Sequence, residues 1–403
     1  MRLTAVFFVF GSLVETFASS VVLMGLGRFL GGIGAGASTV IVPLYISEIA
    51  PPSARGFFGA FTQISINVGI LATQTLGYFL SYGSAWRWIM AAGVMAAGAH
   101  VIGLLFVPES PAWTANVKGD VVSARKTLQR IRGRGISVDA EVEAWRSGGL
   151  SQDPGEEQAL LAGGEPEAGL TAAAPSAAAK LESASHLGFF DVVRDPLTRP
   201  AIIAVVGIMF AQQLCGINSI VMYSVSLLAD LLPTSSALLT ILISLINLFI
   251  TMACSPLPDK LGRKTCLLIS IIGQGSSSLV LALSILFGFK VLSAFAVLLF
   301  VAFFAVGLGP VPFIMASELV AQDAVGATQS WSLGANYIAT FLVAQFFPIV
   351  NVALNKLLGG AGWVYFIFAG FAAVFSVFIV WKVPETNGKK DADEVWGRTR
   401  RLD

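Results

Sequence analysis

Charged residues are scarce in this 403-residue chain: they make up 12% of it, whereas hydrophobic residues make up 55% and the mean hydropathy is +0.78. Soluble proteins carry about 25% charged residues, so the composition excludes two or three ordinary soluble domains. It also excludes disorder throughout the chain, since apolar residues are too abundant. The composition therefore predicts a polytopic membrane protein.

Cysteine and histidine are scarce too. The three cysteines, Cys215, Cys254 and Cys266, lie in apolar stretches and form neither a disulfide framework nor a metal-binding spacing. The two histidines, His100 and His186, are too few and too isolated for a metal site or a histidine-based triad. A net charge of +1 argues against a nucleic-acid partner. We expect no cofactor, no metal and no nucleic acid.

Long apolar stretches, in contrast, are abundant. A hydrocarbon core about 30 Å thick needs roughly 20 apolar residues per helix. Ten candidate spans meet this need, four before and six after a long soluble loop between Val107 and Pro200. They are residues 3–20, 21–46, 58–82, 86–107, 200–230, 235–256, 264–288, 291–320, 326–356 and 361–383.

Lysine and arginine predict the orientation of these spans, because they concentrate in cytoplasmic loops. With both termini inside, the inner side carries 21 of the 25 basic residues and the outer side carries 3, while Arg28 falls inside a span. We therefore expect both termini in the cytoplasm. Residues 1–20 also have the form of a signal peptide, an alternative that leaves the orientation unchanged.

These spans divide the chain into four parts. We expect an incomplete N-terminal transmembrane bundle (1–112), a cytoplasmic linker (113–199), a six-helix C-terminal bundle (200–386) and a cytoplasmic tail (387–403). Residues 148–185 of the linker are poor in aromatics and rich in Ala, Gly, Pro, Ser and Glu, which predicts disorder.

The linker also contains a possible sorting sequence, Glu156-Glu157-Gln158-Ala159-Leu160-Leu161, which has the form of an acidic dileucine signal. As a signal it would direct the protein to an endosomal, lysosomal or vacuolar membrane. As a chance match it would leave the protein at the plasma membrane.

The two halves share short motifs at similar spacing. Glu48 is followed seven residues later by Arg55-Gly56, and Glu318 is followed seven residues later by Val325-Gly326. The halves end their last spans on Pro108-Glu109-Ser110 and Pro384-Glu385-Thr386. The repeat matches the last four spans of each half, so we expect a chain that lacks the first two helices of a 6 + 6 architecture.

On these and other motifs the chain resembles the sugar porter family of the major facilitator superfamily, which includes hexose facilitators and sugar/proton symporters. The motifs are Gly27-Arg28, Pro43-Leu44-Tyr45 through Glu48, Arg55-Gly56, Pro108-Glu109-Ser110-Pro111, Gln212-Gln213-Leu214-Cys215-Gly216-Ile217-Asn218, Asp259 to Lys264, Gly307-Leu308-Gly309-Pro310-Val311-Pro312, and Pro384-Glu385-Thr386. The resemblance implies an all-α membrane protein with two helical bundles, here four plus six of the usual 6 + 6 transmembrane helices.

The function that this resemblance implies is transport of a hexose-like sugar by alternating access, through facilitated diffusion or proton symport. The partners would be a sugar, protons in the symport case, and the lipid bilayer; the oligomeric state stays open. Loss of the first two helices would impair transport, so a non-transporting sugar sensor or remnant is the alternative. An intramembrane enzyme is excluded, since the spans contain no paired acids, Cys/His pair or metal cluster.

Amide side chains in the apolar spans are the candidates for sugar binding. An amide donates and accepts hydrogen bonds without a charge, as a sugar hydroxyl requires, although such amides can equally join helices to one another. Asn67 and Gln74 share a helix face with Gln63, and we expect them to be structural. The resemblance implies that six amides match the family's sugar-contacting positions: Gln63, Gln212, Gln213, Asn218, Asn247 and Asn336.

Two aromatic residues complete the predicted site. Phe313 follows the Gly-Leu-Gly-Pro-Val-Pro run, which should break the eighth span, and it could stack on a sugar ring where many hexose facilitators have tryptophan. A lipid or core contact is the alternative. Tyr223, on the helix face of Gln212, is a candidate outer gate or an interface anchor.

Charged residues at the inner ends of the spans form a second group. They are Glu48, Arg55 and Glu109 in the first half, and Arg263, Lys264, Glu318 and Glu385 in the second. The family pattern favours ion pairs that hold a cytoplasmic gate closed over ordinary snorkelling, although Val325 and Ala112 replace arginines that the family usually has. Arg28, inside a span, should have a partner, and Glu15 is the nearby acid at similar depth.

Overall fold

The computed structural model of the protein describes residues 1–51, 54–116, 118–133, 135–139, 141–143, 188–229, 236–321, 324–389 and 392–398. Within these ranges all regular secondary structure is helical. The chain forms two compact units, one of Met1–Ile46, Pro51–Leu105 and Leu187–Asp403, the other of Ser47–Ala50 and Phe106–His186. The predicted disorder at 148–185 and the dileucine sequence at 156–161 fall outside the described residues.

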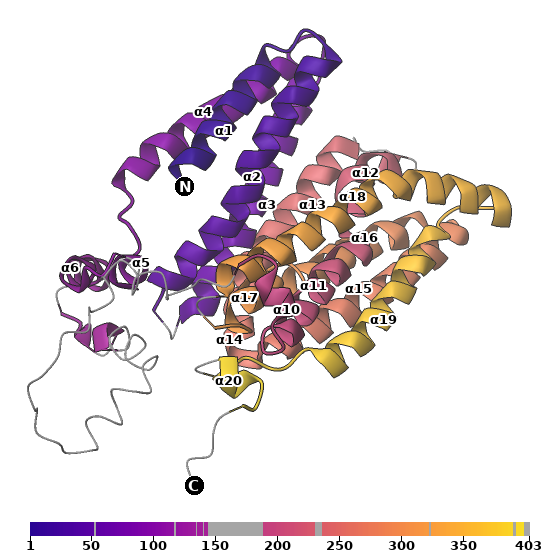
Figure 1. Ribbon diagram of the computed structural model, residues 1–403. Helices are drawn as coiled ribbons and strands as arrows, with labels where there is room; N and C mark the ends of the chain where they lie inside the picture. The colour runs from indigo at the N-terminus through magenta and orange to yellow at the C-terminus, as the bar shows by residue number, and fades with distance from the viewer. Residues whose placement is uncertain are drawn as a thin grey trace, which may run out of the picture. The chain divides into compact units, whose positions relative to one another are not determined.

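Helices occupy the positions of the predicted spans (Figure 1). In the first half these are α1 (Arg2–Thr16), α2 (Val21–Ile49), α3 (Arg55–Leu80) and α4 (Trp86–Phe106). In the second half they are α11 (Arg199–Leu214), α12 (Ile217–Ala229), α13 (Ser236–Cys254), α15 (Arg263–Leu286), α16 (Lys290–Val306), α17 (Val311–Glu318), α18 (Val325–Leu358) and α19 (Val364–Lys382). Short helices are α5 (Pro111–Asn116), α6 (Val121–Arg132), α10 (Asp191–Arg194), α14 (Leu257–Leu261) and α20 (Ala392–Val395).

Seven helical segments of the described chain are long and apolar enough to cross a membrane by length and composition. They are Val21–Ile49, Trp86–Phe106, Arg199–Tyr223, Arg263–Leu286, Lys290–Glu318, Val325–Leu358 and Val364–Lys382, and Leu238–Cys254 is a shorter apolar helix. Of the other two predicted spans, α1 has only 15 residues and α3 carries several amides, which lower its hydropathy. The count of ten spans therefore stays a prediction.

Glycine permits the close packing of α1 on α2. A Cβ atom on Gly11 would lie 2.5 Å from the Gly31 backbone nitrogen, and a Cβ atom on Gly34 would lie 2.9 Å from the Thr4 carbonyl oxygen. Helices within a membrane gain little from apolar burial and associate through close van der Waals contact, which small residues allow. The glycine-rich run of α2 is explained in part by this contact.

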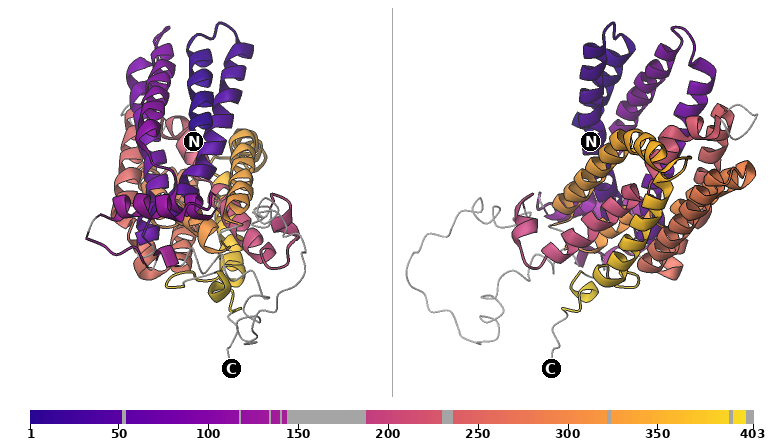
Figure 2. Two further views of the ribbon diagram at one scale, coloured as in Figure 1. Left: turned by 60° about the vertical axis from the view of Figure 1, so that its left-hand side comes forward. Right: turned by 90° about the vertical axis from the view of Figure 1, so that its right-hand side faces the viewer.

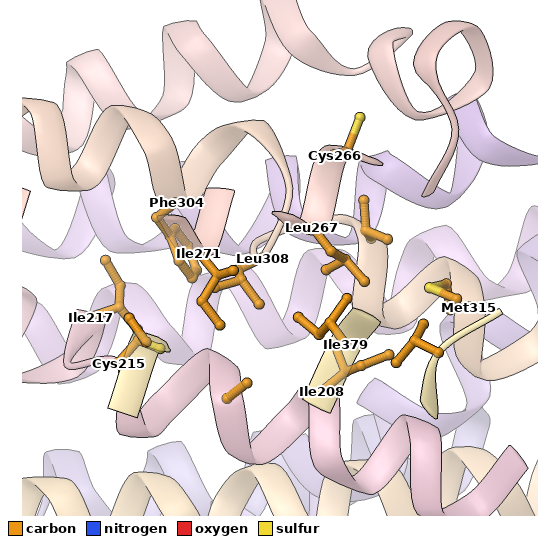
Figure 3. Close-up of a cluster of buried hydrophobic side chains, with 14 of the residues drawn as sticks. Ile208, Cys215, Ile217, Cys266, Leu267, Ile271, Phe304, Leu308, Met315 and Ile379 are labelled. Carbon is orange, nitrogen blue, oxygen red and sulfur yellow. The ribbon is translucent and has the colours of Figure 1, made fainter. Parts of the chain in front are cut away.

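The helices of the second half share one large core. α15 packs against α16 and α19, and α11 packs against α18 and α19 (Figures 1 and 2). Buried side chains from several of these helices meet in it, among them Ile208, Leu267, Ile271 and Phe304 (Figure 3). This packing fixes the faces that α11, α17 and α18 turn toward one another, and the candidate site lies on those faces.

Two predicted spans are each broken into two helices. The span at 291–320 is interrupted between α16 and α17, as its glycines and prolines predicted. The span at 200–230 is also interrupted, between α11 and α12, which differs from the single helix expected. Gly216 adopts a φ of +100° there, a conformation that glycine accommodates readily, and Phe368 occupies the space where a Cβ would project.

Candidate functional site

Four amides from α11, α12 and α18 form a hydrogen-bonded network. Gln213 Nε2 donates to Gln212 Oε1 and to Asn336 Oδ1, each at 3.2 Å. Asn218 Nδ2 donates to Gln213 Oε1 at 2.5 Å and to Thr340 Oγ1 at 3.3 Å. Asn336 Nδ2 donates to Gln212 Oε1. The amides of this network thus come from both sides of the break at Gly216.

Gln212 also contacts the broken helix. Its Nε2 donates to the carbonyl oxygens of Leu308 and Gly309, at 2.5 and 3.3 Å. Such carbonyls lack their usual helical donors where a helix is interrupted. The buried Gln212 side chain therefore satisfies backbone groups of the break and at the same time accepts from Asn336.

A second polar group lies between α3 and α13. Asn67 Nδ2 donates to Thr251 Oγ1 at 2.9 Å, and Asn67 Oδ1 accepts from Gln63 Nε2 at 3.0 Å. The same oxygen accepts from Asn247 Nδ2 at 3.5 Å. Farther along α3, Ser244 Oγ donates to Gln74 Oε1 at 2.5 Å. Asn67, which the sequence suggested to be structural, is thus the central member of this group.

The two polar groups approach each other at Gly309. A Cβ atom on Gly309 would lie 3.5 Å from Gln63 Cγ, and the Gly309 carbonyl oxygen accepts from Gln212. Gln63 from the first half and Gln212 from the second half therefore contact the same short segment. A Cβ atom on Gly309 would be tightest against Phe304, 3.2 Å from its ring carbon Cε1, and would meet Gln63 only at an ordinary van der Waals distance.

The two predicted aromatic residues lie in different surroundings. Phe313 is buried and packs with Met209, Leu333 and Ala335, beside partly buried residues that include Ile66. The Tyr223 hydroxyl donates to the Ala344 carbonyl oxygen at 2.8 Å, and its ring centroid lies 5.1 Å from that of Phe347. Phe313 borders the amides through Met209, whose sulfur accepts from Asn336 Nδ2. Tyr223 ties α12 to α18.

Arg263 is the centre of an ion-pair network at the ends of α14, α15 and α17. It binds Glu318 in two places: Nε lies 3.1 Å from Oε2, and Nη2 lies 2.9 Å from Oε1. Nη2 also lies 2.9 Å from Asp259 Oδ1, and Nη1 donates to Asn387 Oδ1 at 2.8 Å. The guanidinium of Arg263 and the carboxylate of Glu318 are both planar, and their two parallel contacts match the fork geometry of arginine. Asp259 and Asn387 are members that the sequence reasoning missed.

Glu385 has a different function from Glu318 in this network, because its carboxylate caps the start of α15. Its oxygens accept from the backbone nitrogens of Arg263 at 2.8 Å and Lys264 at 3.1 Å. A carboxylate at a helix N-terminus satisfies unpaired N–H groups and complements the helix dipole. Lys264 contributes only its backbone here, since its ammonium group donates to the Val380 carbonyl oxygen at 2.9 Å.

The charged residues predicted for the gate in the first half lie in different parts of the structure. Glu48 and the exposed Glu109 belong to the smaller unit, whereas Arg55 begins α3 and its side chain lies outside the described part of the chain. Arg28 Nε lies 3.6 Å from Glu15 Oε2, the acid that the sequence suggested.

Sequence reasoning missed an arginine in the smaller unit. Arg132 Nη1 donates to the Ile49 carbonyl oxygen at 2.7 Å, at the end of α2, and its other nitrogens form a bidentate pair with Glu141. Nothing in its spacing distinguished Arg132 from the other basic residues of the linker.

At the start of the same helix, α6, Asp120 accepts from the Ser123 backbone N–H, which lowers the pKa of that carboxyl.

No cluster of three or more His, Cys, Asp or Glu side chains that could hold a metal ion occurs among the residues that the structure describes. The polar atoms of the candidate site are neutral amides, hydroxyls and backbone carbonyls. This chemistry suits a neutral ligand with many hydroxyl groups better than an ion.

Comparisons with known proteins agree with this chemistry. The family model described as "Sugar (and other) transporter" matches residues 1–394. The chain is 35% identical over 387 residues to the probable metabolite transport protein YBR241C of Saccharomyces cerevisiae, covering 96% of this chain and 73% of that protein. It is 32% identical over 396 residues to plastidic glucose transporter 4 of Arabidopsis thaliana, covering 96% of this chain and 65% of the relative.

Solved structures show the same fold. The proton:xylose symporter XylE of the major facilitator superfamily, bound to 6-bromo-6-deoxy-D-glucose, matches with a TM-score of 0.76 at 24% identity, over 98% of this chain and 82% of that chain. The relatives are membrane transporters, not enzymes. This chain therefore belongs to the family of sugar (and other) transporters, and it is an integral, multi-pass membrane protein with the major facilitator fold.

Proposed function

We propose that the protein carries a hexose-like sugar across a membrane by alternating access, and that the amide network of α11, α12 and α18 binds the sugar. The observation that carries this proposal is the mutual hydrogen bonding of Gln212, Gln213, Asn218 and Asn336. Each hydrogen bond between these side-chain amides can be exchanged for a hydrogen bond to a sugar hydroxyl, which also donates and accepts. When no sugar is bound, the amides hydrogen-bond to one another, so these buried polar groups are not left unpaired.

Gln63 of the first half and further residues of the second half complete the proposed site. Gln63 approaches Gly309, and Asn247 on α13 contacts Asn67 beside it. Phe313, next to Met209 and Asn336, would offer a ring face to the sugar. Tyr223, tied to Ala344, would act as an outer gate that opens when this hydrogen bond breaks.

The cytoplasmic gate in this proposal is the Arg263 network. Glu318 terminates α17, and α17 begins at the break that Gln212 holds. Opening toward the cytoplasm would move α17 and separate Glu318 from Arg263. In the first half Glu48, Arg55 and Glu109 would act correspondingly, and Arg28 would be held by Glu15.

The energy source is either the sugar gradient alone or a coupled proton gradient. XylE is a proton:xylose symporter, whereas the amide network of α11, α12 and α18 is neutral. We favour facilitated diffusion on this ground, with proton symport as the second candidate. A family member that binds sugar without transport is the remaining alternative.

Uptake of D-glucose into liposomes tests the proposal. Saturable uptake by the wild-type chain would support transport over the impaired transport expected from the missing helices, and Gln213→Ala should then raise the KM about tenfold, since it removes a hydrogen bond to the sugar worth roughly 1.5 kcal/mol. Asn351→Ala is a matched control, because Asn351 pairs with Asn355 on α18 away from the network. Equal KM values for Gln213→Ala and wild type would remove Gln213 from the site.

A further inference from the structure

The break between α16 and α17 displaces one backbone donor from its helical partner. In a continuous helix Leu308 N–H would donate to the Phe304 carbonyl oxygen, but Gly309 N occupies that oxygen at 2.9 Å. A buried N–H without an acceptor is costly and is rarely found. The segment 307–310 therefore needs an acceptor from another helix.

Ser270 on α15 supplies this acceptor. Leu308 N donates to Ser270 Oγ at 2.9 Å, and the same hydroxyl donates to the Phe303 carbonyl oxygen at 2.7 Å. Ser270 is fully buried. One hydroxyl thus joins the last turn of α16 to the first peptide of the break, with both its donor and an acceptor site in use.

The break is held by side chains of two different helices, α15 and α11. Ser270 binds the nitrogen of Leu308, whereas Gln212 binds the carbonyl oxygens of Leu308 and Gly309. Gly307 fits directly against the backbone of α15, since a Cβ there would collide with the Cys266 carbonyl group. The side chain of Leu308 is anchored in the core beside Ile271 and Phe304 (Figure 3).

We infer that Ser270 is a positioning residue for transport, which sets the shape of the break so that its carbonyl oxygens meet Gln212. α17 starts directly after the break and carries Phe313 near the amides and Glu318 on Arg263. The Ser270 hydroxyl thereby fixes the geometry of the sugar site without contact to the sugar. This inference rests on the proposed function, because it assigns Ser270 a part in the same site.

Ser277, another buried serine of α15, differs from Ser270 in one respect. Ser277 Oγ donates to the Gly273 carbonyl oxygen of its own helix, at 2.8 Å. It is buried like Ser270, but its hydrogen bond to Gly273 stays within α15. Ser277→Ala therefore removes an equally buried hydroxyl without touching the break, and it is the matched control for Ser270→Ala.

Hydrogen–deuterium exchange of the purified full chain is the first measurement. Ser270→Ala leaves Leu308 N–H without its acceptor, so exchange in peptides covering residues 303–311 should accelerate about tenfold or more. Ser277→Ala should leave these peptides unchanged. Equal exchange rates in wild type and Ser270→Ala would overturn the inference.

The KM for D-glucose uptake in liposomes is the second measurement. Ser270→Ala should raise the KM several-fold, because Gln212 loses its fixed carbonyl partners. A substitution that only reduces the amount of folded protein lowers Vmax and leaves the KM unchanged, as we expect at most for Ser277→Ala. Accelerated exchange with an unchanged KM would restrict Ser270 to holding the break and would overturn its role in positioning.

Failure of the proposed function gives a different result. If the wild-type chain showed no saturable D-glucose uptake, the proposed function and the positioning role would both fail for this sugar. The exchange experiment would still decide whether Ser270 holds the break, because it requires no transport.

Discussion

Arg263 and Glu318 are joined by a bidentate ion pair, with Nε–Oε2 and Nη2–Oε1 distances of 3.1 and 2.9 Å. The pair connects the first residue of α15 to the last residue of α17, which are 55 positions apart. The Arg263 side chain is 7% exposed and the Glu318 side chain 19%. Water therefore screens the pair less than it screens an exposed pair.

Replacement of Glu318 by glutamine should destabilise the protein by about 3 kcal/mol, since it leaves a buried arginine with fewer negative partners. Asp259 still contacts Arg263, which keeps the loss at the lower end of the range for a buried pair. Thermal unfolding in detergent should show a Tm lower by several degrees. Lys389→Ala, which removes an exposed pair with Glu394, should change the Tm little. Equal Tm values for both variants would contradict the assignment.

The hydrogen bond between Asn67 and Thr251 should couple α3 to α13. In a double-mutant cycle of Asn67→Ala and Thr251→Val, we expect a coupling free energy of about 0.6 kcal/mol, the average for such bonds in membranes. Unfolding by denaturant in lipid or detergent measures it. A coupling energy of zero would show that the 2.9 Å contact contributes nothing to stability.

Gly11→Ala should lower stability, whereas Gly25→Ala should not. A methyl group on Gly11 meets the backbone of Gly31, so α1 and α2 must separate and the Tm should fall. A methyl group on Gly25 meets no atom within 4 Å, and alanine favours the helix by about 0.5–1 kcal/mol, so the Tm should stay or rise. A fall of the same size in both variants would argue against close packing at Gly11.

The membrane in which the protein resides is testable through the dileucine sequence of the linker. If it is a sorting signal, Leu160→Ala with Leu161→Ala should move a tagged protein from an endosomal, lysosomal or vacuolar membrane to the plasma membrane. Gln158→Ala, between the acid and the leucines, should leave the location unchanged. Fluorescence microscopy makes the comparison, and a wild-type protein already at the plasma membrane would rule the signal out.

Much of the candidate site could be predicted from the sequence. Amides such as Gln63 and Gln213 stand out because polar groups are rare in apolar spans, and the glycines and prolines before Phe313 predicted the break after α16. The sequence groups Arg263, Glu318 and Glu385 because each ends or begins a predicted span on the predicted cytoplasmic side, and in the structure Arg263 contacts both acids. Composition and local spacing determine these features, and both can be read directly from the amino-acid sequence.

Only the tertiary structure decided which groups meet. The sequence could not predict that Gln212 reaches Leu308, 96 residues away, or that Ser270 contacts the same peptide from α15. The sequence predicts a single helix over residues 200–230, whereas in the structure Gly216 separates α11 from α12. Hydrogen-bond partners depend on the rotation and distance of packed helices, which the summed contacts of many side chains fix. Composition and spacing are thus enough to predict a helical membrane protein with polar residues in its spans, whereas the partners of those residues follow from helix packing.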